Sequence, residues 1–299
     1  RKEVAVRRVL AARGLCQAIT WSFMDSRLAG LFGSHGVKLA NPIASDLDEL
    51  RPSLVPNLLS AVVRNQAMGS RDVQLFEVGP QFSDATPGAQ QLVACGVRAG
   101  SWTPKHWLEQ TREVDVFDAK ADALAALAAV DAPANVQIFR NTPAWYHPGR
   151  SGSLQLGKNI LAVFGEIHPA VLKAFGIKTP VCAFEVYLDA VPAGKGKKVK
   201  PFRPATLMPL TRDFAFVMDQ SVDAAKVLAT IENVNRDLIT DVAVFDVYQG
   251  EHLPAGKKSL AVQVTIQPRD KTLTDAEIET LSTQIINLVH RNTGADLRS

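Results

Sequence analysis

The 299-residue chain has the composition of an ordinary globular protein, with 46% hydrophobic and 21% charged residues and a formal net charge of +3. This length is sufficient for two domains. No apolar run approaches the roughly 20 residues that a membrane helix needs, and we expect no signal peptide. The three cysteines are far apart and form no C-x-x-C pair, which indicates neither disulfides nor a zinc site. We therefore expect a cytoplasmic protein without a membrane segment.

The first two hundred residues alternate irregularly between short strands and helices. A helix is predicted at the start, with Val6, Val9 and Leu10 on its apolar side, and because no initiator Met precedes it we expect a fragment of a longer protein. Strands are predicted over 19–23, 37–40, 73–78, 92–97, 151–156 and 160–166, and helices from Pro56 to Gly69 and over 119–130. This order is typical of an α+β domain around a largely antiparallel sheet.

A basic segment divides the chain. Residues 192–201 hold four lysines among Gly and Pro, a composition that buries too little apolar surface to order itself. We expect a linker over 193–204 between domains at 1–192 and 205–299. A solvated tether is favoured over lysine contacts with RNA phosphate. Residues 1–200 hold 23 Lys and Arg against 17 Asp and Glu, whereas residues 201–299 hold 10 against 13, so the second domain has little capacity to neutralise phosphate.

The second domain shows the order β-α-β-β-α-β. Strands are predicted over 212–219, 242–248 and 258–266, the last two as a hairpin. Ser221 is expected to cap the first helix, and Thr274 with Glu277 the second as a capping box. The expected apolar stripes are Ala225, Leu228, Ala229 and Ile231 on the first helix, and Ile278, Leu281, Ile285, Leu288 and Val289 on the second. This is a ferredoxin-like arrangement.

The two faces of that predicted sheet differ. Large apolar side chains such as Phe214, Phe216 and Leu260 alternate onto the face toward the helices. The other face is small and polar, and its expected members are Asp213, Ala215, Val217, Val244, Asp246, Tyr248, Ser259, Ala261 and Gln263. An exposed Tyr among short hydrogen-bonding side chains suits unstacked nucleotides, with the ring stacking on a base and Asp or Ser contacting its edge. A merely solvated sheet face is the alternative.

Several sequence blocks resemble one family. The blocks Arg212-Asp213-Phe214-Ala215, Phe245-Asp246-Val247-Tyr248-Gln249-Gly250 and Lys271-Thr272-Leu273-Thr274 are similar to the ferredoxin-fold anticodon-binding domain of bacterial phenylalanyl-tRNA synthetase β chains. The blocks Leu50-Arg51-Pro52-Ser53, His147-Pro148-Gly149-Arg150 and Phe164-Gly165-Glu166-Ile167-His168-Pro169 resemble the class II synthetase-like core module of the same chains. By this resemblance, Ala215, Asp246, Tyr248 and Ser259, with Asp213 beside them, are the expected anticodon contacts of a C-terminal fragment.

The resemblance also implies what the first domain does. Class II adenylation uses arginines on ATP, but Pro80 and Ser83 follow one strand and Ile167-His168-Pro169 follow another, where those cations are needed. The fragment is therefore expected to be inactive alone, with no catalytic or metal residue and no bound cofactor. The resemblance implies partnership with an α subunit in an (αβ)2 heterotetramer, binding of tRNA(Phe), and use of ATP and Mg²⁺ by the whole complex. A stand-alone RNA-binding module is the alternative.

Two polar clusters allow other chemistry. His147 beside Arg150 suggests an acid–base pair, although a structured turn is favoured. Asp46, Asp48 and Glu49 suggest a cation site, but a polar loop that caps a helix explains them more simply.

Overall fold

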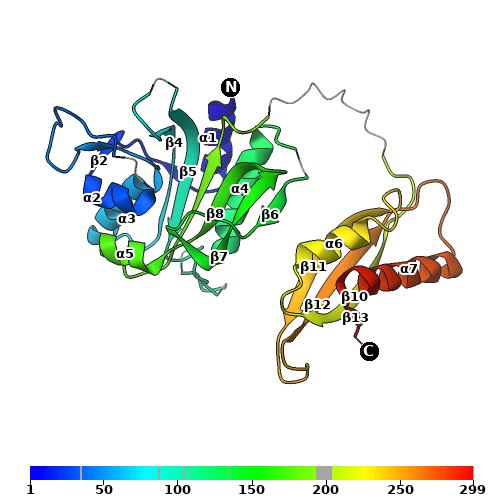
Figure 1. Ribbon diagram of the computed structural model, residues 1–299. Helices are drawn as coiled ribbons and strands as arrows, with labels where there is room; N and C mark the ends of the chain where they lie inside the picture. Colours follow the sequence, from blue (N-terminus) through cyan, green and yellow to red (C-terminus); the bar gives the residue numbers. More distant parts are fainter. Residues whose placement is uncertain are drawn as a thin grey trace. The chain divides into compact units, whose positions relative to one another are not determined.

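The computed structural model describes residues 1–33, 36–86, 88–103, 105–108, 110–133, 135–192 and 204–298. The chain divides into two compact units, unit 1 (Arg1–Lys197) and unit 2 (Lys198–Ser299), both drawn in Figure 1. The predicted linker over 193–204 lies, apart from Pro204, outside the described residues. Within the described ranges, every helix is too short or too polar to span a bilayer.

Unit 1 is built on a seven-stranded sheet. Its strands, in spatial order, are β1 (Cys16–Gln17), β4 (Val73–Phe82), β5 (Gln90–Ala99), β9 (Val181–Tyr187), β8 (Asn159–Ile167), β7 (Tyr146–Leu156) and β6 (Gln137–Phe139). Only the pairing of β1 with β4 is parallel among these described strands. The expectation of an α+β domain around a largely antiparallel sheet is confirmed.

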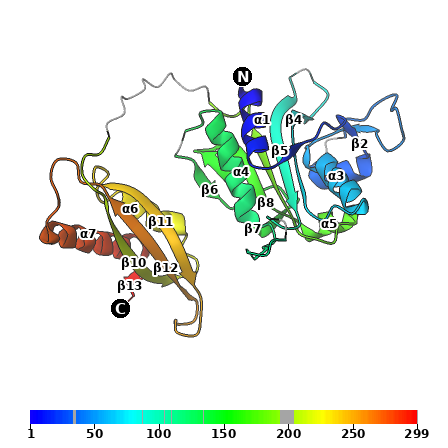
Figure 2. The same cartoon turned by 180° about the vertical axis from the view of Figure 1, so that it is seen from behind.

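Helices cover both faces of this sheet, as Figures 1 and 2 show from opposite sides. α1 (Lys2–Ala12) and α4 (Val116–Ala129) pack on one face, and α3 (Val55–Ala67) and α5 (Pro169–Phe175) on the other. Alternate residues of β9 enter the two cores, Phe184 on the α1/α4 side and Ala183 on the α3 side. α2 (Ser26–Ala29), a 3-10 turn (Gly30–Phe32) and the two-stranded pair β2 (Phe23–Met24) and β3 (Glu49–Leu50) complete unit 1.

Three predictions in unit 1 are wrong. The strand expected over 19–23 shrinks to Phe23 within β2, and that over 37–40 is a single bridge from Lys38 to Glu49, because the partner β3 has only two residues. The turn at His147 is a bulged part of β7, in which the Gly149 N–H donates to His147 Nδ1 at 3.1 Å.

Unit 2 is a four-stranded antiparallel sheet with two helices on one face. Its elements are β10 (Leu210–Asp219), α6 (Ala224–Glu232), β11 (Ile239–Tyr248), β12 (Lys257–Ile266), α7 (Asp275–Thr293) and β13 (Asp296–Leu297), and the spatial order is β11-β12-β10-β13. Phe216 and Met218 of β10 and Val262 of β12 are fully buried in the core with Val227 of α6 and Ile285 of α7. The predicted βαββαβ order is confirmed.

The two helix starts differ in how well they were predicted. α7 begins as expected, with a capping box between Thr274 and Glu277. α6 does not begin at Ser221: its N-cap is Asp223, and residues 219–222 form a turn closed by the Val222 N–H on the Asp219 carbonyl at 3.0 Å. The buried residues of α6 are Val227, Thr230 and Ile231, whereas Ala225 and Ala229, which were expected in the apolar stripe, are exposed.

Candidate nucleic-acid interface

The sheet face of unit 2 opposite α6 and α7 carries cross-strand rows of small or polar side chains. Directly opposed residues of antiparallel strands share a face. The register gives the rows Asp213–Gln263–Ala243, Ala215–Ala261–Asp246 and Val217–Ser259–Tyr248. The five residues expected to form the site, namely Asp213, Ala215, Asp246, Tyr248 and Ser259, therefore lie on one face over three strands.

A β-bulge in β11 decides which residues share that face. Val244 is opposed to Val262 and Asp246 to Ala261, so that Phe245 is an extra residue. The prediction that Val244 lies on the small, polar face is wrong, because it is paired with a residue of the helix-facing core. Phe245, which was not expected in the site, stands opposite Ala261 together with Asp246 and is 59% exposed. The adjacent apolar residues Val244 and Phe245 break the alternation and are the signal that reveals the bulge.

The ring of Tyr248 is held by two close neighbours. A Cβ atom added at Gly250 would lie 2.2 Å from the Tyr248 hydroxyl oxygen and 2.4 Å from its Cζ, so the ring packs against the bare glycine. The guanidinium carbon of Arg298 lies 5.5 Å from the ring centroid, within the range of a cation–π contact. The Arg298 N–H donates to the Ala215 carbonyl at 2.7 Å, which fixes the backbone of Arg298 beside the second row.

The remaining site residues differ in accessibility. Asp246 and Asp213 are exposed, and Asp213 Oδ1 accepts a hydrogen bond from Gln263 Nε2 at 3.1 Å. Ser259 is only 3% exposed although it lies on the predicted face, so a ligand reaches it only after a neighbouring side chain moves. The face thus offers an aromatic surface, two carboxylates and one guanidinium. Such a set can stack a planar ring and accept hydrogen bonds from its edge.

Unit 1 holds a row of polar side chains under α3, where Glu77, Cys95 and Glu185 are opposed on neighbouring strands. Arg51, itself 1% exposed, donates to Glu77 Oε1, Thr20 Oγ1 and the Pro80 carbonyl, each at 2.9 Å.

Glu185 lies at the end of this row, and its carboxylate is also hydrogen-bonded to neighbouring side chains. It accepts from Ser53 Oγ at 2.6 Å, Tyr146 Oη at 3.1 Å and Trp145 Nε1 at 3.2 Å. Burial raises the pKa of Glu185 although these three donors lower it, and burial beside Glu185 and Glu77 raises the pKa of Cys95. The polar atoms of the row are therefore used inside the protein.

The residues of unit 1 do not fit ATP. Pro80 lies within β4, opposite Leu92, and Ser83 Oγ donates to the Ala89 carbonyl at 3.0 Å. His168 caps α5 through Nδ1, which accepts from the Ala170 N–H at 3.1 Å, and Pro169 is its first residue. Arg150 near this helix is paired with Glu166 at 2.5 Å.

The acidic loop of unit 1 also has a local explanation. Asp48 accepts from the Ser26 N–H and Oγ, both at 2.8 Å, at the start of α2, and these bonds lower its pKa. Glu49 is buried in β3. Among the residues whose structure is described, no group of three or more His, Cys, Asp and Glu could hold a metal ion.

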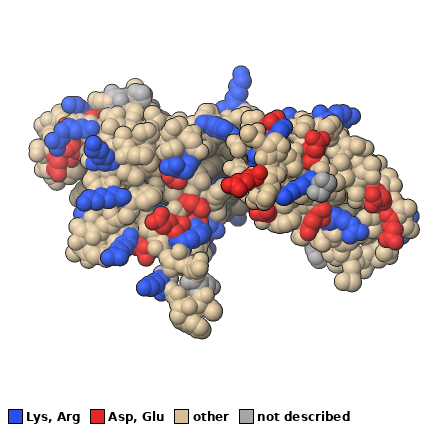
Figure 3. Space-filling model, turned by 90° about the horizontal axis from the view of Figure 1, so that it is seen from below, with Lys and Arg blue, Asp and Glu red and all other residues tan. Residues whose placement is uncertain are grey.

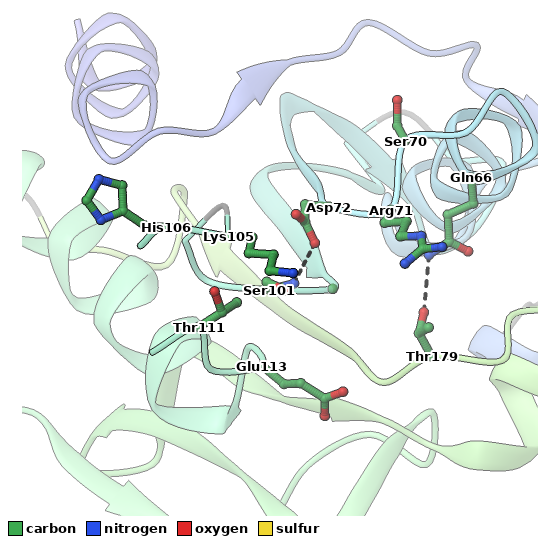
Figure 4. A pocket seen from close by; sticks show the side chains of 11 residues that line it. Gln66, Ser70, Arg71, Asp72, Ser101, Lys105, His106, Thr111, Glu113 and Thr179 are labelled. Carbon is green, nitrogen blue, oxygen red and sulfur yellow. Dashed lines mark hydrogen bonds between the residues drawn. The ribbon is translucent and has the colours of Figure 1, made fainter. Parts of the chain in front are cut away.

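A cavity of about 840 Å³ opens in unit 1 where β4 begins and β5 ends (Figure 4). Its wall includes Arg71, Lys105, His106, Asp72 and Glu113. Asp72 Oδ1 is already used by the Ser101 N–H at 2.7 Å.

Charges are mixed on the surface. Figure 3 shows acidic and basic side chains interspersed over the face that it draws. Unit 2 includes Asp213 and Asp246 at the candidate interface, and the excess of acidic residues over 201–299 leaves this part of the chain with a negative net charge. Long-range attraction to phosphate is therefore weak, and binding has to come from local contacts.

Comparisons with known proteins cover nearly the whole chain. Residues 1–188 match the phenylalanyl tRNA synthetase beta chain CLM domain, and residues 206–298 match the ferredoxin-fold anticodon binding domain. The chain is 50% identical over 305 residues to the phenylalanine–tRNA ligase beta subunit of Rhodospirillum rubrum, and 51% identical over 299 residues to that of Paramagnetospirillum magneticum. These alignments cover 100% and 98% of this chain but 38% of each relative.

A solved structure shares the fold of part of the chain. The crystal structure of pyrrolysyl-tRNA synthetase from Desulfitobacterium hafniense superposes with a TM-score of 0.50 at 16% identity, over 64% of this chain and 66% of that one. This similarity concerns the fold alone.

Proposed function

Because the chain belongs to the family of phenylalanyl-tRNA synthetase β chains, we propose that unit 2 binds the anticodon of tRNA(Phe) on the face that carries Tyr248. The observation that carries this proposal is that Tyr248 and Asp246 lie on one sheet face with Asp213, Ala215 and Ser259, in three rows over three strands. Asp213, Ala215 and Ser259 belong to the same proposed site. A flat ring bordered by acceptors suits an unstacked base better than a duplex, whose bases are already stacked.

Unit 1 is proposed to be a catalytically silent scaffold for the α subunit in an (αβ)2 assembly. Glu77 and Glu185 of its polar row accept hydrogen bonds from buried side chains of the same unit, and Arg51 forms an ion pair with Glu77. Exposed apolar side chains such as Trp21 (64%) and Met68 (88%) suit contact with another protein. ATP and Mg²⁺ would then be used by the whole complex and bound outside this chain.

The alternative of a stand-alone RNA-binding module gains no support. Both relatives named above are β subunits, and they match the two units together. The full ligase is therefore the setting in which the proposed function is best tested.

The test replaces Tyr248 in the assembled ligase. We expect Tyr248→Ala to cost about 1–3 kcal/mol of tRNA interaction, because stacking on the ring is lost. This corresponds to a decrease in kcat/KM for tRNA of roughly 5- to 150-fold. Tyr248→Phe should cost much less, because stacking needs the ring and not the hydroxyl group. The measurement is aminoacylation at limiting tRNA.

Two controls separate binding from folding. Formation of phenylalanyl-adenylate without tRNA should be unchanged in both variants, and their thermal unfolding should show that unit 2 is intact. An unchanged kcat/KM for tRNA in a fully folded Tyr248→Ala enzyme would refute the assignment of this face to the anticodon.

A further inference from the structure

We propose that Arg298 is a further RNA-contacting residue of unit 2, which covers the Tyr248 ring in the free protein and clamps an anticodon base against that ring in the complex. This inference rests on the proposed function. The ligand class is one unstacked nucleotide with its own phosphate, held between an aromatic ring and a guanidinium plane.

The backbone of β13 places Arg298 on the sheet face that carries Tyr248. β13 pairs with β10 through Leu297 opposite Phe216, and the Arg298 N–H donates to the Ala215 carbonyl at 2.7 Å. Ala215 and Ala261 are opposed in the same row, and their small side chains leave room above the sheet. The long Arg298 side chain reaches the Tyr248 ring from the opposite edge of the sheet, since β13 and β11 are the two outer strands.

The guanidinium group remains available to a ligand. Arg298 is exposed, and in the described part of the chain no carboxylate pairs with it. Asp213 and Asp246 lie on the same face, whose Lys257 is paired with Asp219 at 3.0 Å. The positive charge of Arg298 at the stacking surface therefore offsets the negative charge of the phosphate of the bound nucleotide.

The observed spacing requires a small opening. A stacked base needs roughly one contact distance of ~3.5 Å on each side, or about 7 Å in all, whereas the guanidinium carbon and the ring centroid are 5.5 Å apart. The ring itself is held against Gly250, so it is the flexible arginine side chain that moves. The free protein thus has the ring aligned and its open side covered by a movable cation.

The experiment measures binding of the full chain to a 5′-labelled anticodon stem-loop of tRNA(Phe). The variants are Arg298→Ala, Arg298→Lys and Tyr248→Ala, with Arg291→Ala as a matched control, because Arg291 is an exposed arginine in the last turn of α7 on the helix side of the same unit. At about 150 mM salt we expect Arg298→Ala to weaken binding roughly 5- to 20-fold and to reduce the salt slope by about 0.7. Arg298→Lys should keep the slope and lose roughly 2- to 5-fold, because the planar contact is lost.

Two further readouts exclude a structural role. In protein labelled with 3-fluorotyrosine, Arg298→Ala should shift the ¹⁹F signal of Tyr248 in the free state, and Arg291→Ala should not. In the Tyr248→Ala background, Arg298→Ala should cost much less than in the wild type, because the two side chains hold the same base.

The outcomes are distinguishable. If Tyr248→Ala weakens binding but Arg298→Ala leaves it equal or tighter, or if the two losses add, Arg298 is no clamp and only this inference fails. If the wild-type chain does not bind the stem-loop, or Tyr248→Ala has no effect, the proposed function fails and this inference with it.

Discussion

At the scale of single residues, Glu185 shows how unit 1 keeps a carboxylate inside the protein. The side chain is 1% exposed and accepts hydrogen bonds from Ser53, Trp145 and Tyr146. A buried group that makes all its hydrogen bonds stabilises one arrangement of its neighbours. Here it fixes the start of α3 and the start of β7 relative to β9.

We expect Glu185→Gln to lower the free energy of unfolding by about 1–3 kcal/mol, because an amide group would turn a donor toward donors. Burial raises the pKa of Glu185 above its ordinary value of 4.5. The folded state therefore holds this proton more tightly than the unfolded chain, and the free energy of unfolding should fall as the pH rises from about 4.5 through the raised pKa.

Urea unfolding followed by tryptophan fluorescence from pH 4 to 8 measures this effect, since the four tryptophans all lie in unit 1. The Gln variant should lack that part of the pH dependence. The same slope in both proteins would contradict the assignment.

The proposed site was largely predictable at this scale because alternation places side chains in a regular strand. Tyr248, Asp246 and Ser259 lie on the expected face. The errors in the predicted site come from two structural features that an alternating sequence pattern does not reveal. A bulge moved Val244 to the other face and added Phe245, and close packing buried Ser259. The Arg298–Tyr248 contact joins strands at opposite edges and has no local signal in the sequence.

At the scale of elements, α7 depends on its first turn. Thr274 Oγ1 accepts from the Glu277 N–H at 3.3 Å, and Glu277 Oε2 accepts from the Thr274 N–H at 2.8 Å. Lys271, together with the donors of Thr274, lowers the pKa of Glu277 to about 2.

We expect Thr274→Ala to destabilise unit 2 by about 1 kcal/mol, because the first turn loses its cap. Thr283→Ala is the control, since Thr283 is an exposed residue in the middle of the same helix. Hydrogen exchange of the α7 amides should accelerate only in the Thr274 variant. The cap should also weaken as the pH falls from about 4.5 toward 2, because the lowered pKa of Glu277 means that its contribution is complete only above the unfolded value. Equal exchange in the two variants would show that the cap is unimportant.

Elements with a strong local signal were predicted best. α7 has a capping box and a regular apolar stripe, and β10 and β12 alternate cleanly. β9 was not predicted, although β5 and β8 are buried on both faces to a similar extent and were predicted. The short pairs near Phe23 and Lys38 depend on distant partners, which a sequence pattern does not contain.

At the scale of the whole molecule, the proposed scaffold role of unit 1 leads to a prediction about the chain without a partner. We expect the purified chain to show no phenylalanine-dependent exchange of pyrophosphate into ATP, because Pro80 and Ser83 offer no cation and Arg51 is paired with Glu77. The assembled ligase is the positive control. Exchange by the chain alone that disappears when one of its own residues is changed would overturn this expectation.

The outer strand of unit 2 has a consequence for how copies of the protein behave toward one another. β11 is an edge strand with exposed Phe245 and Val247, and such edges invite pairing with another chain. Its ladder is interrupted twice, near Thr240 and at Phe245. The bulge at Phe245 therefore also makes this edge a poorer template for pairing with another chain. Deletion of Phe245 would leave Tyr248 opposite Ser259 and make the ladder regular there, so the protein would keep its stacking surface and lose this protection against self-association.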